Sequence, residues 1–350
     1  MLKREKFLLE ISAACDFYEP LARADFGECS RRLGAAREMA ANFHASGGRA
    51  TAACAALSKI ADRLLEDICR VFLSRRPERA ALAGAKFCVA ALGGYGRGEM
   101  CPRSDIDIMF LFSGSLPKQL RSAVVDEFLY PLWNLHLKVG HVSLTSAEAL
   151  ENASKDAVFK NALLDARVVV GSKPLFGRFK SRFSLSVFLG RRRFFGQLMR
   201  LKRLRHEKFG WTPYLQEPDI KNGVGGLRDF QIMRTLARIY SGGDLRALVR
   251  SGALSAAQYM RLARAFEFLL GARIRLHCVA SAPTETVDAE FQEALADFFE
   301  PQAEPSARIG AFMRRLYFAF RTIDFAAKTL RRRMRLKLPA DMRGGFSAAS

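Results

Sequence analysis

The stretch "ALGGYGRGEMCPRSDIDIMFLF", residues 91–112, constrains the fold of this chain more than any other segment. Two short, apolar, β-rich runs, "KFCVAAL" and "IDIMFLF", stand on either side of a Gly-rich turn, and such runs are typical of buried strands. A third run, "KVGHVSLT", follows an amphipathic helix. Together they predict a small mixed α/β sheet between about residues 85 and 145.

Two aspartates stand where the second predicted strand begins. Asp105 and Asp107 are two positions apart, so in a strand their side chains leave the same face, while Ile106 and Ile108 point into the core. Two neighbouring carboxylates repel each other, which predicts a cation between them. Mg²⁺ suits this pattern, and a pair of such ions can stabilise the attacking and leaving oxygens of phosphoryl transfer. The alternative is a solvated strand edge without an ion.

The Gly-rich turn "GGYGRG" supplies a second candidate feature. Without Cβ atoms its backbone can approach a triphosphate, and Arg97 is a residue type that binds phosphate oxygens. The turn is neither a dinucleotide fingerprint, because Glu99 breaks G-x-G-x-x-G, nor a P-loop, because no G-K-[ST] follows. The predicted nucleotide-binding residues are Gly93, Gly94, Arg97 and Ser104.

The rest of the chain shows helical periodicity. Apolar residues recur every three or four positions before residue 80 and again after about 146. We therefore predict an α+β protein, with a small mixed-sheet core and large all-helical flanking regions. The expected organisation is an N-terminal helical region (1–80), an α/β core (81–150), a helical domain (151–338) and a flexible tail (339–350).

Composition limits the partners and the compartment. The net charge of +21 attracts polyanions, so RNA is one expected partner, although basic runs at 191–208 and 328–339 are also typical of solvated helix faces. The chain contains no apolar stretch long enough to span a membrane and has no signal peptide. Its seven cysteines include no C-x-x-C pair, which indicates reduced thiols. We expect a cytoplasmic protein without membrane contact.

A second motif, "QEPDIKNGVGGLRD" at 216–229, combines Pro and Gly breaks with charged residues. Its cations can bind phosphate or a carboxylate, its glycines permit close backbone approach, and its acids are candidates for a third metal ligand or a base. A packed connection with local ion pairs is the equally weighted alternative. Three histidines, His141, His206 and His277, lack ligand-spaced partners and indicate packing roles. The candidate substrate- or phosphate-binding residues of this motif are Glu217, Lys221, Gly225, Gly226, Arg228 and Asp229.

Gly-Gly, ten residues, then Asp-hydrophobic-Asp resembles the nucleotidyltransferases that share the fold of DNA polymerase beta. The fuller string is similar to the catalytic domain of the bacterial PII uridylyltransferases, and the likeness spans roughly residues 85–330. Further segments that carry it are "WNLHLKVGH", "DAVFKNALLDARVVVG", "TPYLQEPDIKNGVGGLRDFQ" and "FEFLLGARIRLH".

The resemblance implies a Mg²⁺-dependent enzyme, with two ions held by Asp105 and Asp107. It would transfer a nucleoside monophosphate from a nucleoside triphosphate to an acceptor hydroxyl and release pyrophosphate. The expected donor is UTP, with ATP as the other candidate. The expected acceptor is a PII-like protein of nitrogen regulation.

The likeness also has departures. The sequence contains no His-Asp dipeptide, so we expect the family's uridylyl-removing hydrolase and sensor domains to be missing. Asn134 and Leu144 stand where the family usually has Asp and Arg, and a third metal-binding carboxylate is unplaced. The alternative function is therefore a weakened or inactive relative that acts as a basic nucleic-acid- or protein-binding module. Retention of both the glycine pair and the aspartate pair favours the enzyme.

Overall fold

A computed structural model describes residues 7, 10–11, 15–75 and 86–336, with side chains as far as residue 333. By its packing the chain divides into two units, Met1–Leu189 and Gly190–Ser350, and each is described by itself. The predicted tail at 339–350 lies outside the described residues. None of the described helices carries an apolar stretch long enough to cross a lipid bilayer.

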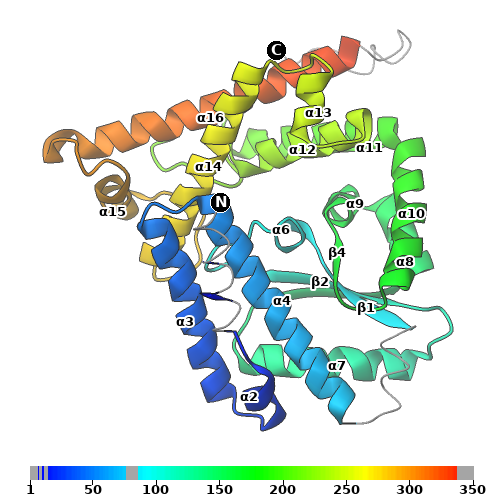
Figure 1. The fold of residues 1–350 in the computed structure, drawn as a ribbon. Coiled ribbons are helices and arrows are strands. Elements are labelled where there is room, and N and C mark those ends of the chain that lie inside the picture. The colour runs from blue at the N-terminus through cyan, green and yellow to red at the C-terminus, as the bar shows by residue number, and fades with distance from the viewer. Residues whose placement is uncertain (1–6, 8–9, 12–14, 76–85, 337–350) are drawn as a thin grey trace. The chain divides into compact units, whose positions relative to one another are not determined.

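The first unit is built around one sheet with helices packed on it (Figure 1). The sheet order is β3-β2-β1-β4, with β1 antiparallel to both of its neighbours and β2 parallel to β3. The described elements are α2 (Tyr18–Ala22), α3 (Phe26–Ala45), α4 (Ala50–Ser74), β1 (Phe87–Ala91), α6 (Gly93–Gly96), β2 (Ile106–Phe112), α7 (Lys118–Asn134), β3 (Val139–Thr145), α8 (Ser146–Lys155), α9 (Ala157–Leu164), β4 (Arg167–Gly171) and α10 (Lys173–Leu189).

The mixed sheet and its helical flanks confirm the predicted α+β class. The three predicted strands are present as β1, β2 and β3. The expectation of helix alone after residue 146 is wrong at β4, which pairs with β1 from Cys88 to Ala91. Because β4 is only five residues long and lies between two helices, the helical periodicity around it hid its β-branched "VVV" run. The predicted domain limits remain predictions.

The helices before the sheet pack against it and share its hydrophobic core. Phe72 of α4 makes an edge contact with Phe87 of β1, at 6.1 Å between ring centroids, and lies 6.0 Å from Phe128 of α7. Phe110 of β2 also meets Phe128 edge-on at 5.7 Å. Such aromatic pairs add to the free energy gained by burying the rings. The helical region from residue 15 onward is therefore part of the same packed body as the sheet.

The described part of the second unit, through residue 336, is helical apart from its loops and one isolated β-bridge between Asp219 and Thr286 (Figure 1). Helices α14 and α16 pack together, and Phe230 of α12 stacks on Phe266 of α14 with ring centroids 3.9 Å apart. The described elements are α11 (Arg191–Lys208), α12 (Leu227–Ser241), α13 (Leu245–Arg250), α14 (Ala256–Val279), α15 (Ala289–Phe299) and α16 (Pro305–Leu336).

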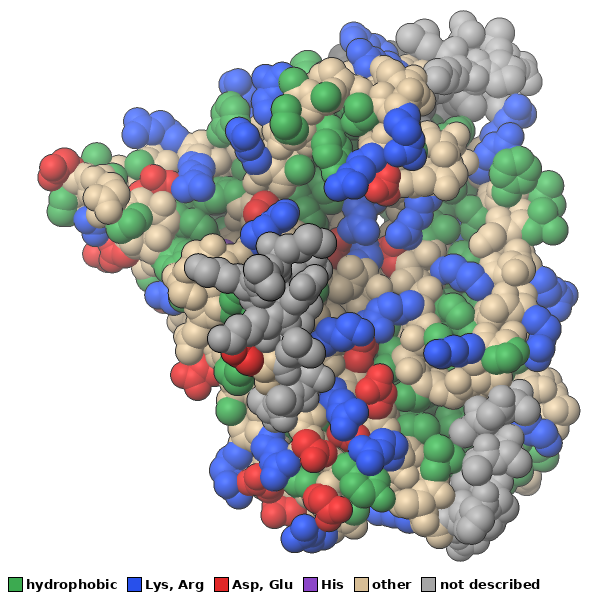
Figure 2. Space-filling model, in the orientation of Figure 1, with side chains coloured by type: hydrophobic (Ala, Val, Ile, Leu, Met, Phe, Trp, Pro, Cys, Tyr) green, Lys and Arg blue, Asp and Glu red, His purple; other side chains and the backbone are tan. Residues whose placement is uncertain are grey.

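Two cations of the basic run at 191–208 form buried ion pairs inside the second unit. Lys202 and Arg205 of α11 are largely buried, with side chains 16% and 13% exposed, and both pair with the carboxylate of Asp229. Figure 2 shows other Lys and Arg side chains interspersed with Asp and Glu over the visible face. The run is therefore neither wholly a solvated face nor wholly a surface for polyanions.

Candidate active site

The two aspartates lie at the start of β2. Asp105 and Asp107 are exposed, whereas Ile106 and Ile108 are buried, so the alternation predicted for this strand is present. The remainder of β2, through Phe112, is buried on both faces. The first residues of an otherwise buried strand thus carry two carboxylates that face solvent on the same side of the sheet.

Glycines border the Asp107 carboxylate on two sides. β2 and β3 place Gly140 directly opposite Asp107, and a Cβ at position 140 would lie 2.4 Å from Asp107 Oδ1. On the other side, a Cβ at Gly93 would lie 3.7 Å from Asp107 Oδ2, and Gly93 has φ +51°. The backbone N–H of Leu92 donates to the Asp107 carbonyl at 2.9 Å, which ties the Gly turn to β2. The predicted Gly loop and the predicted carboxylates are therefore neighbours.

The turn before β2 is closed by local hydrogen bonds. Ser104 Oγ accepts from the backbone N–H of Cys101 at 2.9 Å, and Ser104 N–H donates to the Cys101 carbonyl at 2.9 Å. Lys138 Nζ lies 3.2 Å from Asp105 Oδ2, and its carbonyl accepts from Ile106 N–H at 2.9 Å. Because the Lys138 and Asp105 side chains are 79% and 43% exposed, this ion pair can open easily. Ser104 thus shapes the turn that presents Asp105.

Arg97 is held by protein carboxylates. Its Nε lies 2.6 Å from Glu99 Oε2 and its Nη1 lies 2.9 Å from Asp165 Oδ2. All three side chains are 9% exposed or less. Burial by itself lowers the pKa of Arg97, but the two carboxylates outweigh it and raise that pKa above its ordinary value. The role that this geometry supports for Arg97 is to fix the Gly turn against the segment before β4.

A second buried network holds Tyr95 of the same turn. The Tyr95 hydroxyl donates to Asp62 Oδ1 of α4 at 2.8 Å, and Arg167 Nη2 of β4 donates to the same oxygen at 2.8 Å. Lys59 Nζ lies 3.3 Å from the other carboxylate oxygen. Burial and the adjacent Asp62 carboxylate raise the pKa of Tyr95, so the phenol stays protonated. Two buried networks, one around Arg97 and one around Asp62, therefore connect the Gly turn to β4 and the segment before it. The network around Asp62 also includes helix α4.

Sequence reasoning did not find Asp62, Gly140, Asp165 or Arg167. Gly140 stood in the quoted "KVGH", and Asp165 and Arg167 stood in the quoted "LLDARVVVG". The available signal was that these strings belong to the same family resemblance as the Gly turn. What was missing was β4, since only its pairing with β1 brings residues 165–167 to the turn.

In the second unit, the residues of the 216–229 motif bind mainly one another and their neighbours. Lys221 Nζ pairs with Glu285 Oε1 at 3.1 Å, and Glu217 Oε1 accepts from the N–H of Ala289 at 3.2 Å. Arg228 is exposed. These contacts are those of a packed connection.

The two glycines of this motif allow close backbone packing. A Cβ at Gly225, where φ is +78°, would lie 2.1 Å from the Phe320 carbonyl oxygen of α16. A Cβ at Gly226 would lie 2.7 Å from the Ile220 carbonyl oxygen. Neither position tolerates a larger residue without moving a backbone, so both glycines serve the fold of this loop.

Asp229 lies at the centre of a buried charge cluster. Its carboxylate accepts from the Gly225 N–H at 2.9 Å and lies 2.8 Å from His206 Nε2. Burial opposes its ionisation, but Lys202, His206 and Arg205 overcome that and hold the pKa of Asp229 well below its usual range.

His206, Asp229 and Asp324 bring one possible ligand atom each within 4.8 Å of one another, a spacing that could suit a metal ion. Lys328 Nζ, however, lies 2.7 Å from Asp324 Oδ2, and Lys202 and Arg205 pair with Asp229. Three cations against two carboxylates leave little attraction for a further one. We therefore assign this cluster to the packing of the second unit.

Two family models match the chain. Residues 34–132, which include the Gly turn and both aspartates, match the DUF294 nucleotidyltransferase family. Residues 193–330 match the family described as GlnD PII-uridylyltransferase. The first match covers the Gly turn and the aspartate pair, and the second covers the 216–229 motif.

Curated relatives agree with the family models. A "Bifunctional uridylyltransferase/uridylyl-removing enzyme" of Rhodospirillum rubrum is 36% identical over 264 residues, which are 75% of this chain and 28% of the relative. Proteins of the same description from Burkholderia orbicola and Bradyrhizobium sp. are 36% and 34% identical, over 70% and 60% of this chain and 29% and 23% of their own lengths. The chain spans less than a third of the length of these relatives. As its motifs predict, the chain is similar to the PII-uridylyltransferase family.

Proposed function

We propose that the first unit is a Mg²⁺-dependent nucleotidyltransferase site that moves a nucleoside monophosphate, with UMP favoured, onto an acceptor hydroxyl. The observation that carries this proposal is the outward-facing Asp105 and Asp107 beside the Gly93–Gly94 turn, with glycines on both sides of the Asp107 carboxylate. The match of residues 34–132 to a nucleotidyltransferase family supports the same chemistry.

The residues present fit a divalent cation. Asp105 and Asp107 supply carboxylate oxygens, which Mg²⁺ prefers, and Gly93 and Gly140 leave open the space that a Cβ would fill next to Asp107. Lys138, the exposed partner of Asp105, marks where positive charge is already favourable. When bound, Mg²⁺ would neutralise phosphate charge and lower the pKa of a coordinated hydroxyl or water.

The chain's own contribution is positioning. The Gly93–Gly94 backbone would lie against the triphosphate, and the Arg97 and Tyr95 networks would keep that turn rigid during transfer. The acceptor oxygen bonds to the α-phosphorus while the bond from that phosphorus to the bridging oxygen breaks. Pyrophosphate leaves, and the proton of the acceptor hydroxyl passes to water.

The proposed identities of the nucleotide donor and of the acceptor are inferred from the relatives. The names of these relatives describe uridylyl transfer, which favours UTP as the donor, with ATP as the alternative. The family description names PII, which favours a hydroxyl group of a PII-like protein as the acceptor. None of these relatives is named for RNA, so an RNA acceptor has only the net charge of +21 behind it.

The test is pyrophosphate release by the full chain, given each ribonucleoside triphosphate with Mg²⁺, alone and with a PII-like protein or bulk RNA. Asp105→Asn with Asp107→Asn removes both charges at nearly constant shape, and Asp126→Asn on α7 is the exposed matched control. We expect release with UTP that requires the PII-like protein, persists in the control and is lost in the double variant.

Other outcomes discriminate between the candidate functions. Pyrophosphate release that requires RNA would support nucleotidyl transfer and identify RNA, rather than a PII-like protein, as the acceptor. No release from folded protein with any donor or acceptor would refute transfer and favour the alternative, a basic binding module. Circular dichroism of each variant establishes that it is folded.

A further inference from the structure

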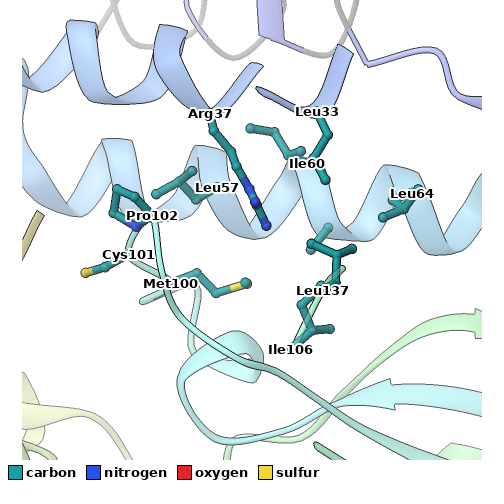
Figure 3. A pocket seen from close by; sticks show the side chains of 11 residues that line it. Leu33, Arg37, Leu57, Ile60, Leu64, Met100, Cys101, Pro102, Ile106 and Leu137 are labelled. Carbon is teal, nitrogen blue, oxygen red and sulfur yellow. The ribbon is translucent and has the colours of Figure 1, made fainter. Parts of the chain in front are cut away.

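Cys54 of α4 and Cys101 of the loop before β2 bring their two sulfur atoms within 3.8 Å of each other. The residues are 47 positions apart in the chain, and both side chains are buried. Figure 3 shows Cys101 on the loop that passes alongside α4, with its sulfur directed away from Arg37. The sulfurs of a disulfide are about 2.05 Å apart, so a closing movement of roughly 1.8 Å separates this contact from a covalent bond.

The loop has room for such a movement. A space of about 10 Å³, enough for roughly one water molecule, lies between α3, α4 and the loop residues Met100, Cys101 and Pro102. A small shift of the loop toward α4 would close this space, so it would not have to compress packed side chains. Cys54 is fixed in α4, within the alanine-rich stretch "ATAACAAL". We therefore assign the movement to Cys101.

Cys101 also belongs to the turn that presents Asp105. Its N–H donates to Ser104 Oγ at 2.9 Å, and its carbonyl accepts from the Ser104 N–H at 2.9 Å. A bond between Cys101 and Cys54 would therefore tie α4 directly to the turn that leads into β2. Reduced and oxidised protein would differ in how firmly this turn is held.

We propose that Cys54 and Cys101 are a redox-active thiol pair, which a small peroxide oxidises to a reversible disulfide. Thiol pairs of this kind are compatible with a reducing compartment, where disulfides form transiently. Buried thiols react slowly with oxidants, so the reaction proceeds when the turn at 101–104 opens for a moment. The proposal does not depend on the proposed function, because it concerns the two thiols alone.

The reaction balances in two steps. One thiolate attacks a peroxide oxygen, the O–O bond breaks, and the products are a sulfenic acid and, with the proton of the thiol, one molecule of water. The second thiol then displaces the sulfenic oxygen, so the S–S bond forms and a second molecule of water leaves. Two thiols thereby give two electrons to one molecule of hydrogen peroxide. The second step is fast compared with further oxidation because the other sulfur is already 3.8 Å away.

The test treats the folded full chain with hydrogen peroxide, blocks the remaining thiols and maps the peptides by mass spectrometry without reduction. We expect one cross-linked pair that joins Cys54 to Cys101, lighter than the two thiol peptides by two hydrogen atoms, and dithiothreitol should separate it. Cys54→Ala and Cys101→Ala should each lose it. Cys278→Ser, which removes an exposed thiol of α14, is the control and should keep it.

A second readout is the urea midpoint. The bridge closes a loop of the unfolded chain, so oxidised wild type should unfold at a higher urea concentration than reduced protein, and dithiothreitol should reverse the rise. Cys101→Ala should show no rise, which separates the bridge from other effects of peroxide. The proposal is wrong if peroxide oxidises Cys278 without producing the cross-linked pair, or if the pair forms only after urea has unfolded the protein.

Discussion

The guanidinium of Arg97 lies 2.9 Å from the carboxylate of Asp165, a residue 68 positions further along the chain. This ion pair joins the Gly turn that follows β1 to the short segment, Asp165 and Ala166, that precedes β4. The same arginine also pairs with Glu99, so a single buried cation contacts two buried carboxylates.

Arg97→Met should destabilise the first unit strongly, because it removes the cation that pairs with the largely buried side chains of Glu99 and Asp165. Loss of one partner from a buried pair costs about 3–5 kcal/mol of unfolding free energy. Urea denaturation of the variant beside wild type would measure it. Arg178→Met, on the exposed face of α10, is the comparison and should change stability by about 0.5 kcal/mol at most. Equal stability of Arg97→Met and wild type would show that the network is dispensable.

Gly140→Ala should impair nucleotide transfer with little effect on stability. Its Cβ would lie 2.4 Å from Asp107 Oδ1, so the carboxylate must rotate away from the position that we propose for metal binding. A displacement of about 1 Å at a reacting group can cost about 100-fold in rate. Gly114→Ala has no atom within 4 Å of the added Cβ and is the matched control. Pyrophosphate release and urea denaturation of both variants separate the two effects, and full activity in Gly140→Ala would exclude Asp107 from the reaction.

Gly225→Ala should destabilise the second unit more than Gly242→Ala does. Both glycines have positive φ, +78° and +64°, so each substitution carries the left-handed penalty of about 1–2 kcal/mol. Only at Gly225 would the new Cβ also meet a backbone, at 2.1 Å from the Phe320 carbonyl oxygen. Thermal unfolding of the two variants measures the difference, and equal losses would mean that the loop moves freely away from α16.

Acid should destabilise the second unit below about pH 4. The pKa values of Asp229 and Glu285 lie well below their ordinary values of 3.8 and 4.5, against the effect of burial, because Lys202 and Arg273 respectively hold the charged forms. A carboxyl with a depressed folded pKa stabilises the protein above its unfolded pKa, and this stability is lost as pH falls toward the folded value.

Asp229→Asn tests this dependence. It should be less stable than wild type at pH 7 and should lose less stability between pH 5 and pH 3, measured as the urea midpoint at each pH. Glu290→Gln, an exposed acid at the start of α15, should follow the wild-type curve. A wild-type midpoint that rises on acidification would contradict the assignment.

The sequence predicted those features that local periodicity encodes. Alternation placed Asp105 and Asp107 on one face of β2, and composition placed the Gly turn between two strands. Long-range contacts were not readable. The pairing of Arg97 with Asp165, and the approach of Gly140 to Asp107, depend on sheet order, which a single sequence does not state.

The same limit explains the charged residues of the second motif. Asp229 and Lys221 have the residue types of a catalytic or phosphate-binding loop, and nothing in their spacing shows that His206 and Glu285 would meet them. Burial decides between the two interpretations, and burial depends on how α11 and α14 pack. Their roles in the fold therefore emerged only with the structure.

The strand order also has a consequence for synthesis of the protein. β1 is an inner strand, and its outer edge is paired only by β4 at Arg167–Gly171. A nascent chain that has left the ribosome as far as Thr145 therefore carries β1, β2 and β3 but exposes the unpaired edge of an apolar strand. A gene fragment that stops at residue 150 would encode a protein in which this edge of β1 stays unpaired. Recombinant versions of the first unit should therefore extend past Gly171.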